Sequence, residues 1–195
     1  MSKEEIQELL RRNLAPDRRS ISTEEGLEIA RAAARTAAEK GIACALVGGL
    51  ALHLYGFTRA TTDVDMIAEA LLGWEAKEPL SFGGETYLAS TGERDVALDW
   101  IVRSDVFRDF YEAALRDAVA AEENLRVVDP EWMVLLKYVG GRGKDRIDLL
   151  WLLQQPGLVD RDRVRSLLVG VLGEKAAALP LREIEGLFLL ADAGS

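Results

Sequence analysis

Two aspartates, Asp63 and Asp65, lie two positions apart in the stretch 62–67, where polar and apolar residues alternate. A period of two predicts a β-strand, so both carboxylates project from one face, with their Cα atoms about 6.5 to 7 Å apart. Carboxylate oxygens are the ligands that Mg²⁺ prefers, together with substrate phosphates. The pair therefore predicts a metal site, the alternative being a solvated strand face.

A third acid on a neighbouring strand would complete a two-metal site. The stretch 94–102 also alternates, and we expect Asp99 to supply this acid because both its neighbours, Leu98 and Trp100, are apolar. Asp95 lies on the same face and remains the alternative. Crowding carboxylates costs about 4 kcal/mol for a pair at 4 Å in an effective dielectric near 20, so three together suggest bound cations.

The adjacent glycines Gly48 and Gly49 follow the apolar run 42–47, which predicts a strand buried on both faces, and precede a short predicted helix over 50–55. A glycine turn lets the backbone approach a phosphate, and the first N–H groups of a helix favour an anion. Strand, Gly-Gly, helix and an Asp-x-Asp strand thus combine phosphate donors with magnesium ligands.

The remaining elements must position these residues. A capping box of Ser22 and Glu25 begins an Ala-rich helix that ends before Gly41. The stretch 72–90 contains Pro79 and a Gly-Gly pair, which favour a loop and hairpin. We also expect a short edge strand over 125–128 and helices over 3–12, 104–120 with Ser104 as its cap, 130 onward to the break at 140–143, 144–154, 162–172 and 181–190.

Composition limits the class of protein. The chain has 195 residues, 49% of them hydrophobic, and a formal net charge of −9, which disfavours a general coat for nucleic acid. The single cysteine, Cys44, excludes an intramolecular disulfide and fits a cytoplasmic protein; we expect it to be buried and inert. The uncharged stretch 41–58 is punctuated by glycines, so we expect no membrane span. We also expect no signal peptide in the charged N-terminal residues.

The motif Arg59-Ala60-Thr61-Thr62-Asp63-Val64-Asp65, after its Gly-Gly turn, resembles the minimal nucleotidyltransferases of the DNA polymerase beta superfamily, particularly the AbiEii-type toxin group. The resemblance continues downstream in Lys137, Arg142, Lys144-Asp145-Arg146 and Ile147-Asp148-Leu149 and covers roughly residues 41–153. Residues 73–91 match no part of the family's pattern.

The resemblance implies an α/β (α+β) fold, a small mixed sheet flanked by helices. It divides the chain into N-terminal helices (1–40), a nucleotidyltransferase core (41–128) and a C-terminal helical extension (129–195). It also implies transfer of a nucleoside monophosphate from ATP or another NTP to an acceptor hydroxyl on an RNA 3′ end, a protein or a small molecule. A toxin role would bring an antitoxin partner.

The family's roles carry over onto matching positions. Asp63, Asp65 and Asp99 would bind Mg²⁺ and act in catalysis, with Asp99 helping to activate the acceptor hydroxyl. The residues expected near nucleotide or phosphate are Gly48, Gly49, Arg59, Thr61, Lys137, Arg142 and Lys144. Residues 137–146 carry four basic side chains and one acid, a local charge of +3 that suits a polyphosphate.

Simpler interpretations remain open. Lys137 and Arg142 are equally explained as exposed cations that satisfy helix-end carbonyls. Asp145 and Asp148 are expected to pair with neighbouring bases, Lys144 with Asp148 for instance, or to cap a helix. His53 is expected to be a packed core residue. The whole chain could also be a nucleotide-binding or partner-binding module whose site has lost its activity.

Overall fold

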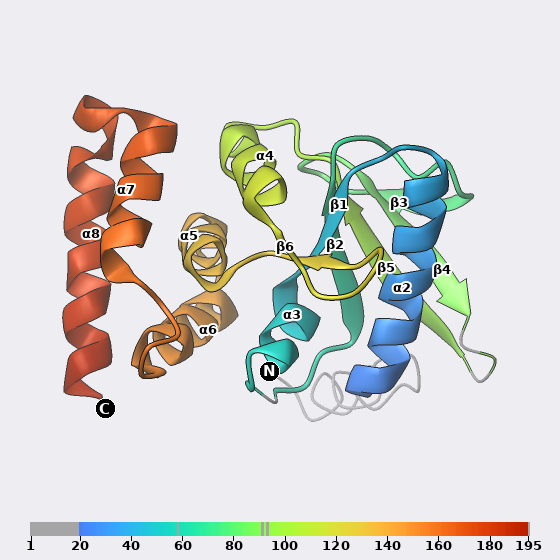
Figure 1. The fold of residues 1–195 in the computed structure, drawn as a ribbon, viewed down its shortest axis with the longest axis horizontal. Coiled ribbons are helices and arrows are strands. Elements are labelled where there is room, and N and C mark those ends of the chain that lie inside the picture. The colour runs from blue at the N-terminus through green and yellow to red at the C-terminus, as the bar shows by residue number, and fades with distance from the viewer. Residues whose placement is uncertain (1–19, 58, 91, 93, 195) are drawn as a thin grey trace, which may run out of the picture.

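The computed structural model describes residues 20–57, 59–90, 92 and 94–194. The helix expected over 3–12 lies outside these residues. The described chain is a mixed α/β fold built around one seven-stranded sheet, which confirms the expected fold class. Figure 1 shows α2 along one side of the sheet, α4, α5 and α6 on the other side, and the pair α7 and α8 outermost.

The strand order is β3-β4-β5-β2-β1-β7-β6, with parallel and antiparallel neighbours. β2 pairs antiparallel with β1 and parallel with β5, which brings Asp65 opposite Val47 on one side and Asp99 on the other. The strands are β1 (Cys44–Val47), β2 (Asp63–Ala68), β3 (Ala76–Pro79), β4 (Glu85–Ser90), β5 (Asp95–Ile101), β6 (Val119–Ala120) and β7 (Arg126–Val127).

The helices begin and end at residues suited to those positions. Ser22 and Glu25 form the expected capping box, Asp129 caps α5 by accepting a hydrogen bond from the Trp132 N–H, and Gly141 ends α5 in the left-handed conformation. The helices are α2 (Thr23–Glu39), α3 (Gly48–Leu54), α4 (Arg108–Asp117), α5 (Pro130–Gly140), α6 (Gly143–Gln154), α7 (Arg161–Leu172) and α8 (Glu174–Ala193).

The two faces of the central strands have different surroundings. On one face, Val64, Met66, Leu98 and Trp100 are fully buried, and the buried alanines of α2 belong to the same core. Small side chains let the helix approach the sheet closely, as the Ala-rich sequence predicted. The opposite face of β2 and β5 carries the aspartates, so burial of one face fixes the direction of the carboxylates on the other.

Two expected elements, α4 and β7, differ from those observed. Ser104 does not cap α4: the Asp105 carboxylate accepts a hydrogen bond from the Phe107 N–H, and the helix starts at Arg108. The helix also ends early because Ala118 is extended and leads into β6. β7 is not an edge strand, because β6 pairs on its outer side.

The last helix is longer than expected. α8 begins at Glu174 and contains Pro180, although proline costs about 3 kcal/mol or more inside a helix. Ala177 lies before the proline and is fully buried, so tertiary packing holds the first turns in place. The predicted hairpin within 72–90 is present as β3 and β4.

The uncharged stretch 41–58 forms β1 and α3 where the structure describes it. Among the described helices, none has the length and apolar character needed to cross a bilayer. Cys44 is buried as expected, and burial raises the pKa of its thiol to about 11. A thiol with that pKa stays protonated and is a poor nucleophile.

Candidate functional site

Three carboxylates converge on one face of the sheet. Asp63, Asp65 and Asp99 each offer an oxygen, and these oxygens all lie within 4.8 Å of one another. The parallel register of β2 and β5 sets Asp65 directly opposite Asp99. Asp95, the alternative third acid, is exposed at the start of β5 and is not part of this group. We call Asp63, Asp65 and Asp99 the Asp cluster.

The Asp cluster is electrostatically strained without a cation. Burial, with the charges of Asp63 and Asp99, raises the pKa of Asp65 to about 7. Burial also raises the pKa of Asp99, although the hydrogen bond that Thr86 donates to it opposes the shift. Three half-buried oxygen donors within reach of one another fit a hard cation such as Mg²⁺, so these residues can hold a metal ion.

The glycine turn fits closely against the cluster. Gly48 has a φ of +73°, and a Cβ added to it would lie 1.9 Å from Oδ2 of Asp65. A Cβ on Gly49 would lie 2.7 Å from Oγ1 of Thr61. Both glycines belong to the first turn of α3, so any side chain here would displace a residue of the motif.

Thr61 and Arg59 have structural partners next to the aspartates. The Thr61 hydroxyl is buried and donates to Asp63, with an Oγ1 to Oδ1 distance of 3.1 Å. The Arg59 guanidinium forms a bidentate pair with Asp148, at 2.7 and 2.9 Å. The Arg59 side chain thus joins the loop before β2 to α6.

Lys137 is buried between two carboxylates. Its Nζ lies 2.7 Å from Asp148 and 3.1 Å from Asp145, and Asp145 also accepts from Nε of Arg142 at 2.6 Å. The pair of bonds from Arg142, with the charge of Lys137, lowers the pKa of Asp145 even though burial opposes it. We call Arg59, Lys137, Arg142, Asp145 and Asp148 the ion cluster.

The ion cluster corrects two expectations. Lys137 is not an exposed cation that satisfies carbonyls, since only 7% of it is exposed and both its partners are carboxylates. Asp148 pairs with neighbouring bases as expected, but those bases are Arg59 and Lys137 rather than Lys144. The i,i+4 spacing of Lys144 and Asp148 predicted the wrong partner, because Asp148 is buried in the core whereas Lys144 is exposed to solvent.

The cations lie close enough to act on the carboxylates. The charges of Lys137 and Lys144 both lower the pKa of Asp65, against the stronger effect of burial. A small cavity of about 50 Å³ is lined by Gly48, Asp65, Lys137 and Arg142 among others. Glycine turn, carboxylate and cations therefore share one cavity, although residues 137 and 142 are far from 48 and 65 in sequence.

Two contacts of the site were missed by the sequence analysis. Thr86 lies on β4 opposite Asp99 and donates to its carboxylate at 2.7 Å, within the segment that no motif covered. His53 is half-buried rather than a core residue, and its ring nitrogens contact the Thr23 hydroxyl and the Arg59 carbonyl. No sequence spacing indicates these partners, because each contact joins different elements.

Comparison with known proteins adds little to this geometry. No protein-family model matches the sequence, and no curated protein matches it. One similar solved structure is an antigenic nucleotidyltransferase-like protein from Paracoccidioides brasiliensis, with 16% identity, a TM-score of 0.49, and coverage of 87% of this chain and 94% of the other. The function proposed next therefore rests on the site itself.

Proposed function

We propose that this protein is a Mg²⁺-dependent nucleotidyltransferase that moves a nucleoside monophosphate from an NTP to an acceptor hydroxyl. The observation that carries the proposal is the Asp cluster, whose three carboxylates converge beside a glycine turn with a left-handed Gly48. Backbone donors for phosphate and oxygen ligands for a hard cation lie together, which is the pair of functions that this chemistry needs.

In this proposal the chain's own residues bind and orient two substrates. Gly48 and Gly49 approach the triphosphate, and Lys144 and Arg142 supply positive charge near it. Lys137 would join them only after separating from Asp145 and Asp148. Asp63, Asp65 and Asp99 would hold Mg²⁺, one ion or two, which would neutralise charge on the phosphates. Arg59 and Thr61 position the loop before β2 rather than contact phosphate, since their side chains are occupied by Asp148 and Asp63.

The transfer step involves the acceptor hydroxyl, the α-phosphate of the NTP and the Asp99 carboxylate. The acceptor oxygen forms a bond to the α-phosphorus, and the bond from that phosphorus to the bridging oxygen breaks. Pyrophosphate leaves with the bonding electron pair, and the hydroxyl proton passes to the Asp99 carboxylate. In this arrangement residues 41–128 form the nucleotidyltransferase core, and the C-terminal extension, residues 129–195, contributes Lys137 and Arg142 beside the site.

The test is transfer from α-labelled ATP, GTP, CTP and UTP, with Mg²⁺, to total RNA, protein or small molecules. We expect transfer by the wild type and a loss of at least about 100-fold in Asp63→Asn, Asp65→Asn and Asp99→Asn. Asp95→Asn is the matched control, because it removes one carboxylate from β5 outside the Asp cluster. Unaltered transfer in the cluster variants would overturn the assignment.

One observation favours a second candidate, a nucleotide-binding module without transfer activity. Lys137 is already neutralised by Asp145 and Asp148, so it is not free to meet a phosphate in this conformation. Tight Mg²⁺-dependent binding of an NTP in calorimetry, with no transfer to any acceptor class, would support this module. A toxin role with an antitoxin partner is a further part of the proposal, and a small antitoxin-like gene beside this one would support it.

A further inference from the structure

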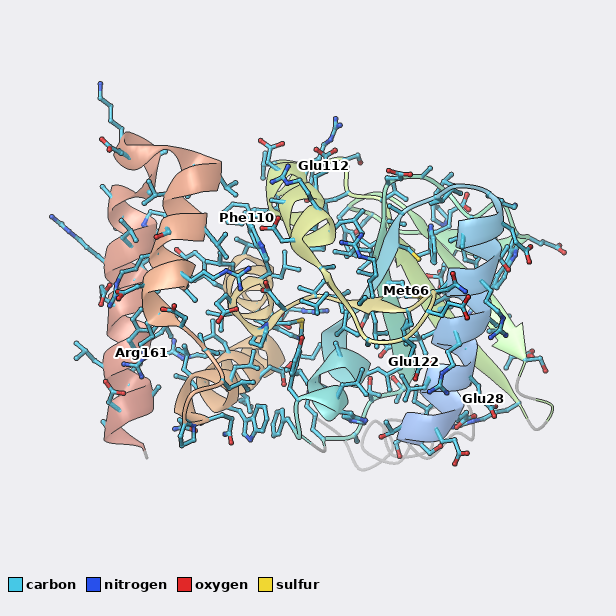
Figure 2. All side chains as sticks on the ribbon, in the orientation of Figure 1. Glu28, Met66, Phe110, Glu112, Glu122 and Arg161 are labelled. Carbon is cyan, nitrogen blue, oxygen red and sulfur yellow. The ribbon has the colours of Figure 1, made fainter. Side chains whose placement is uncertain are left out.

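A second and larger cavity lies beyond the Asp cluster, beneath α4. It has a volume of about 640 Å³ and is lined by the ends of β2 and β5 and by α4. In Figure 1 helix α4 lies toward one end of the sheet and helix α3, which begins at the glycine turn, lies toward the other. Figure 2 labels Glu112, a residue of α4 that lines this cavity. A volume of this size suits a ligand of small-molecule dimensions. We call it the α4 cavity.

The α4 cavity continues the face that carries the carboxylates. Ile67 and Ile101 line it, and each lies two positions beyond an aspartate of the Asp cluster on the same strand. Residues two apart on a strand share a face, with Cα atoms about 6.5 to 7 Å apart. Ile101 and Tyr111 also line the small cavity that contains Asp65. The two cavities therefore share a wall.

The lining of the α4 cavity is rich in arginine although the chain is acidic. It contains four arginines and two glutamates, Glu69 and Glu112. Arg103 is stacked over the Tyr111 ring at 4.6 Å and pairs with Asp105, which holds its guanidinium in place. The arginines are Arg103, Arg108, Arg116 and Arg126.

Among the described residues Arg126 has no carboxylate partner, and Arg116 has only a long, exposed ion pair. Arg126 donates to the main-chain carbonyls of Arg116 and Ala118, and no ion pair joins it to a carboxylate in the described part of the chain. The contact of Arg116 is with Asp117, at 3.8 Å. Planar guanidinium groups bind phosphate oxygens well, often through two hydrogen bonds.

We infer that the α4 cavity binds the acceptor of the transfer reaction, a small molecule that carries a phosphate group. This inference rests on the proposed function, because it places the acceptor beside Asp99. The phosphate lies against the exposed guanidinium groups of Arg108 and Arg116, with Arg126 in the same lining, and the hydroxyl extends past Ile101 toward the Asp cluster. There its oxygen bonds to the α-phosphorus, pyrophosphate departs with the electron pair, and the proton passes to Asp99.

The first experiment measures binding of inorganic phosphate by calorimetry at low ionic strength, with EDTA to remove metal. We expect saturable binding that is at least about tenfold weaker in the double variant Arg108→Gln/Arg116→Gln. Both side chains are largely exposed, at 60% and 74%, so this variant should fold. The control is Arg182→Gln, an exposed position on α8 outside the α4 cavity.

The second experiment repeats the titration with saturating Mg²⁺ and non-hydrolysable analogues of the four NTPs. We expect phosphate to bind with unchanged affinity, since nucleotide and acceptor occupy different cavities. Absence of phosphate binding, equal binding in the double variant and the control, or displacement of phosphate by an analogue would each overturn the inference. So would transfer confined to RNA and unaltered in the double variant.

These experiments distinguish failure of the proposed nucleotidyltransferase function from failure of the proposed acceptor site. If none of the analogues binds, the proposed function fails, while phosphate binding that depends on Arg108 and Arg116 still establishes the anion site. If the analogues bind and transfer occurs but phosphate binding does not depend on these arginines, the nucleotidyltransferase stands and the acceptor site does not. Asp95→Asn should leave phosphate binding unchanged in the first experiment, because Asp95 lies outside both the Asp cluster and the α4 cavity.

Discussion

At the scale of single residues, Gly48 is required by two constraints that act together. Its φ of +73° is a conformation that L residues adopt at a cost of about 1–2 kcal/mol. The space where its side chain would lie is occupied by Oδ2 of Asp65, which is also an expected metal ligand. Gly41 shares the first constraint, with a φ of +69°, but has nothing within 4 Å of an added Cβ.

The comparison of these two glycines gives the first prediction. Gly41→Ala should lower the free energy of unfolding by about 1–2 kcal/mol and leave Mg²⁺ binding unchanged. Gly48→Ala should cost more than this and also weaken Mg²⁺ binding, because the methyl group displaces Asp65. Urea denaturation and calorimetry measure both quantities. Equal effects of the two substitutions would show that the approach of Asp65 to Gly48 does not matter.

At the scale of elements, the ion cluster joins α5, α6 and the loop before β2. Lys137 on α5 and Asp148 on α6 are almost entirely buried, and Arg59 completes the group from the loop. Removing one partner of a buried pair leaves an uncompensated charge in a low dielectric, which costs far more than loss of a surface pair. The cluster therefore fixes where the C-terminal helices lie relative to the Asp cluster.

The second prediction follows from this arrangement. Asp148→Ala should lower the free energy of unfolding by about 3–5 kcal/mol, because both Lys137 and Arg59 lose a carboxylate partner. Asp192→Ala is the matched control: its carboxylate pairs with Arg161 on the surface with a side-chain exposure of 57%, so about 1 kcal/mol or less is expected. Denaturant midpoints compare the two variants, and a similar loss in both would contradict the role given to Asp148.

At the scale of the whole molecule, the crowded carboxylate of Asp65 makes the free energy of unfolding depend on pH. The pKa of Asp65 is about 7 in the folded protein, above the ordinary value of 3.8, because of burial and the charges of Asp63 and Asp99. The folded state therefore binds more protons than the unfolded state between about pH 4 and 7. Stability must then fall as the pH rises through this window and become level above it.

The third prediction concerns the metal-free protein. Its free energy of unfolding should fall by about 2.6 kcal/mol from the contribution of Asp65 between pH 5 and pH 8, since each unit of pH below the folded pKa is worth about 1.4 kcal/mol. Asp65→Asn should remove that part of the slope, whereas Asp95→Asn should keep it. Thermal unfolding in EDTA across this range measures it, and parallel curves for wild type and Asp65→Asn would refute the prediction.

Mg²⁺ should oppose this loss in the wild type. A ligand that binds only the folded state at about 100 times its dissociation constant adds about 2.7 kcal/mol. The gain should be larger at pH 8 than at pH 5, because Asp65 must lose its proton to bind metal.

Local patterns made much of the architecture predictable. Alternation at 62–67 and 94–102 predicted β2 and β5, and cap residues predicted the starts of α2 and α5, because these signals depend on neighbours in sequence. The start of α4 and the length of α8 were wrong, since tertiary packing and the Asp105 side chain override local preference there. The position of β7 depended on β6, which two residues are too few to signal.

The sequence by itself determined that Asp63 and Asp65 share a strand face beside a glycine turn, because the period of a strand and the conformational freedom of glycine are local properties. Only the tertiary structure decided that Asp99 rather than Asp95 joins them, since that choice depends on the register between two strands. It also decided that Lys137 is enclosed by carboxylates and that four arginines line one cavity, because these contacts join elements that are far apart along the chain.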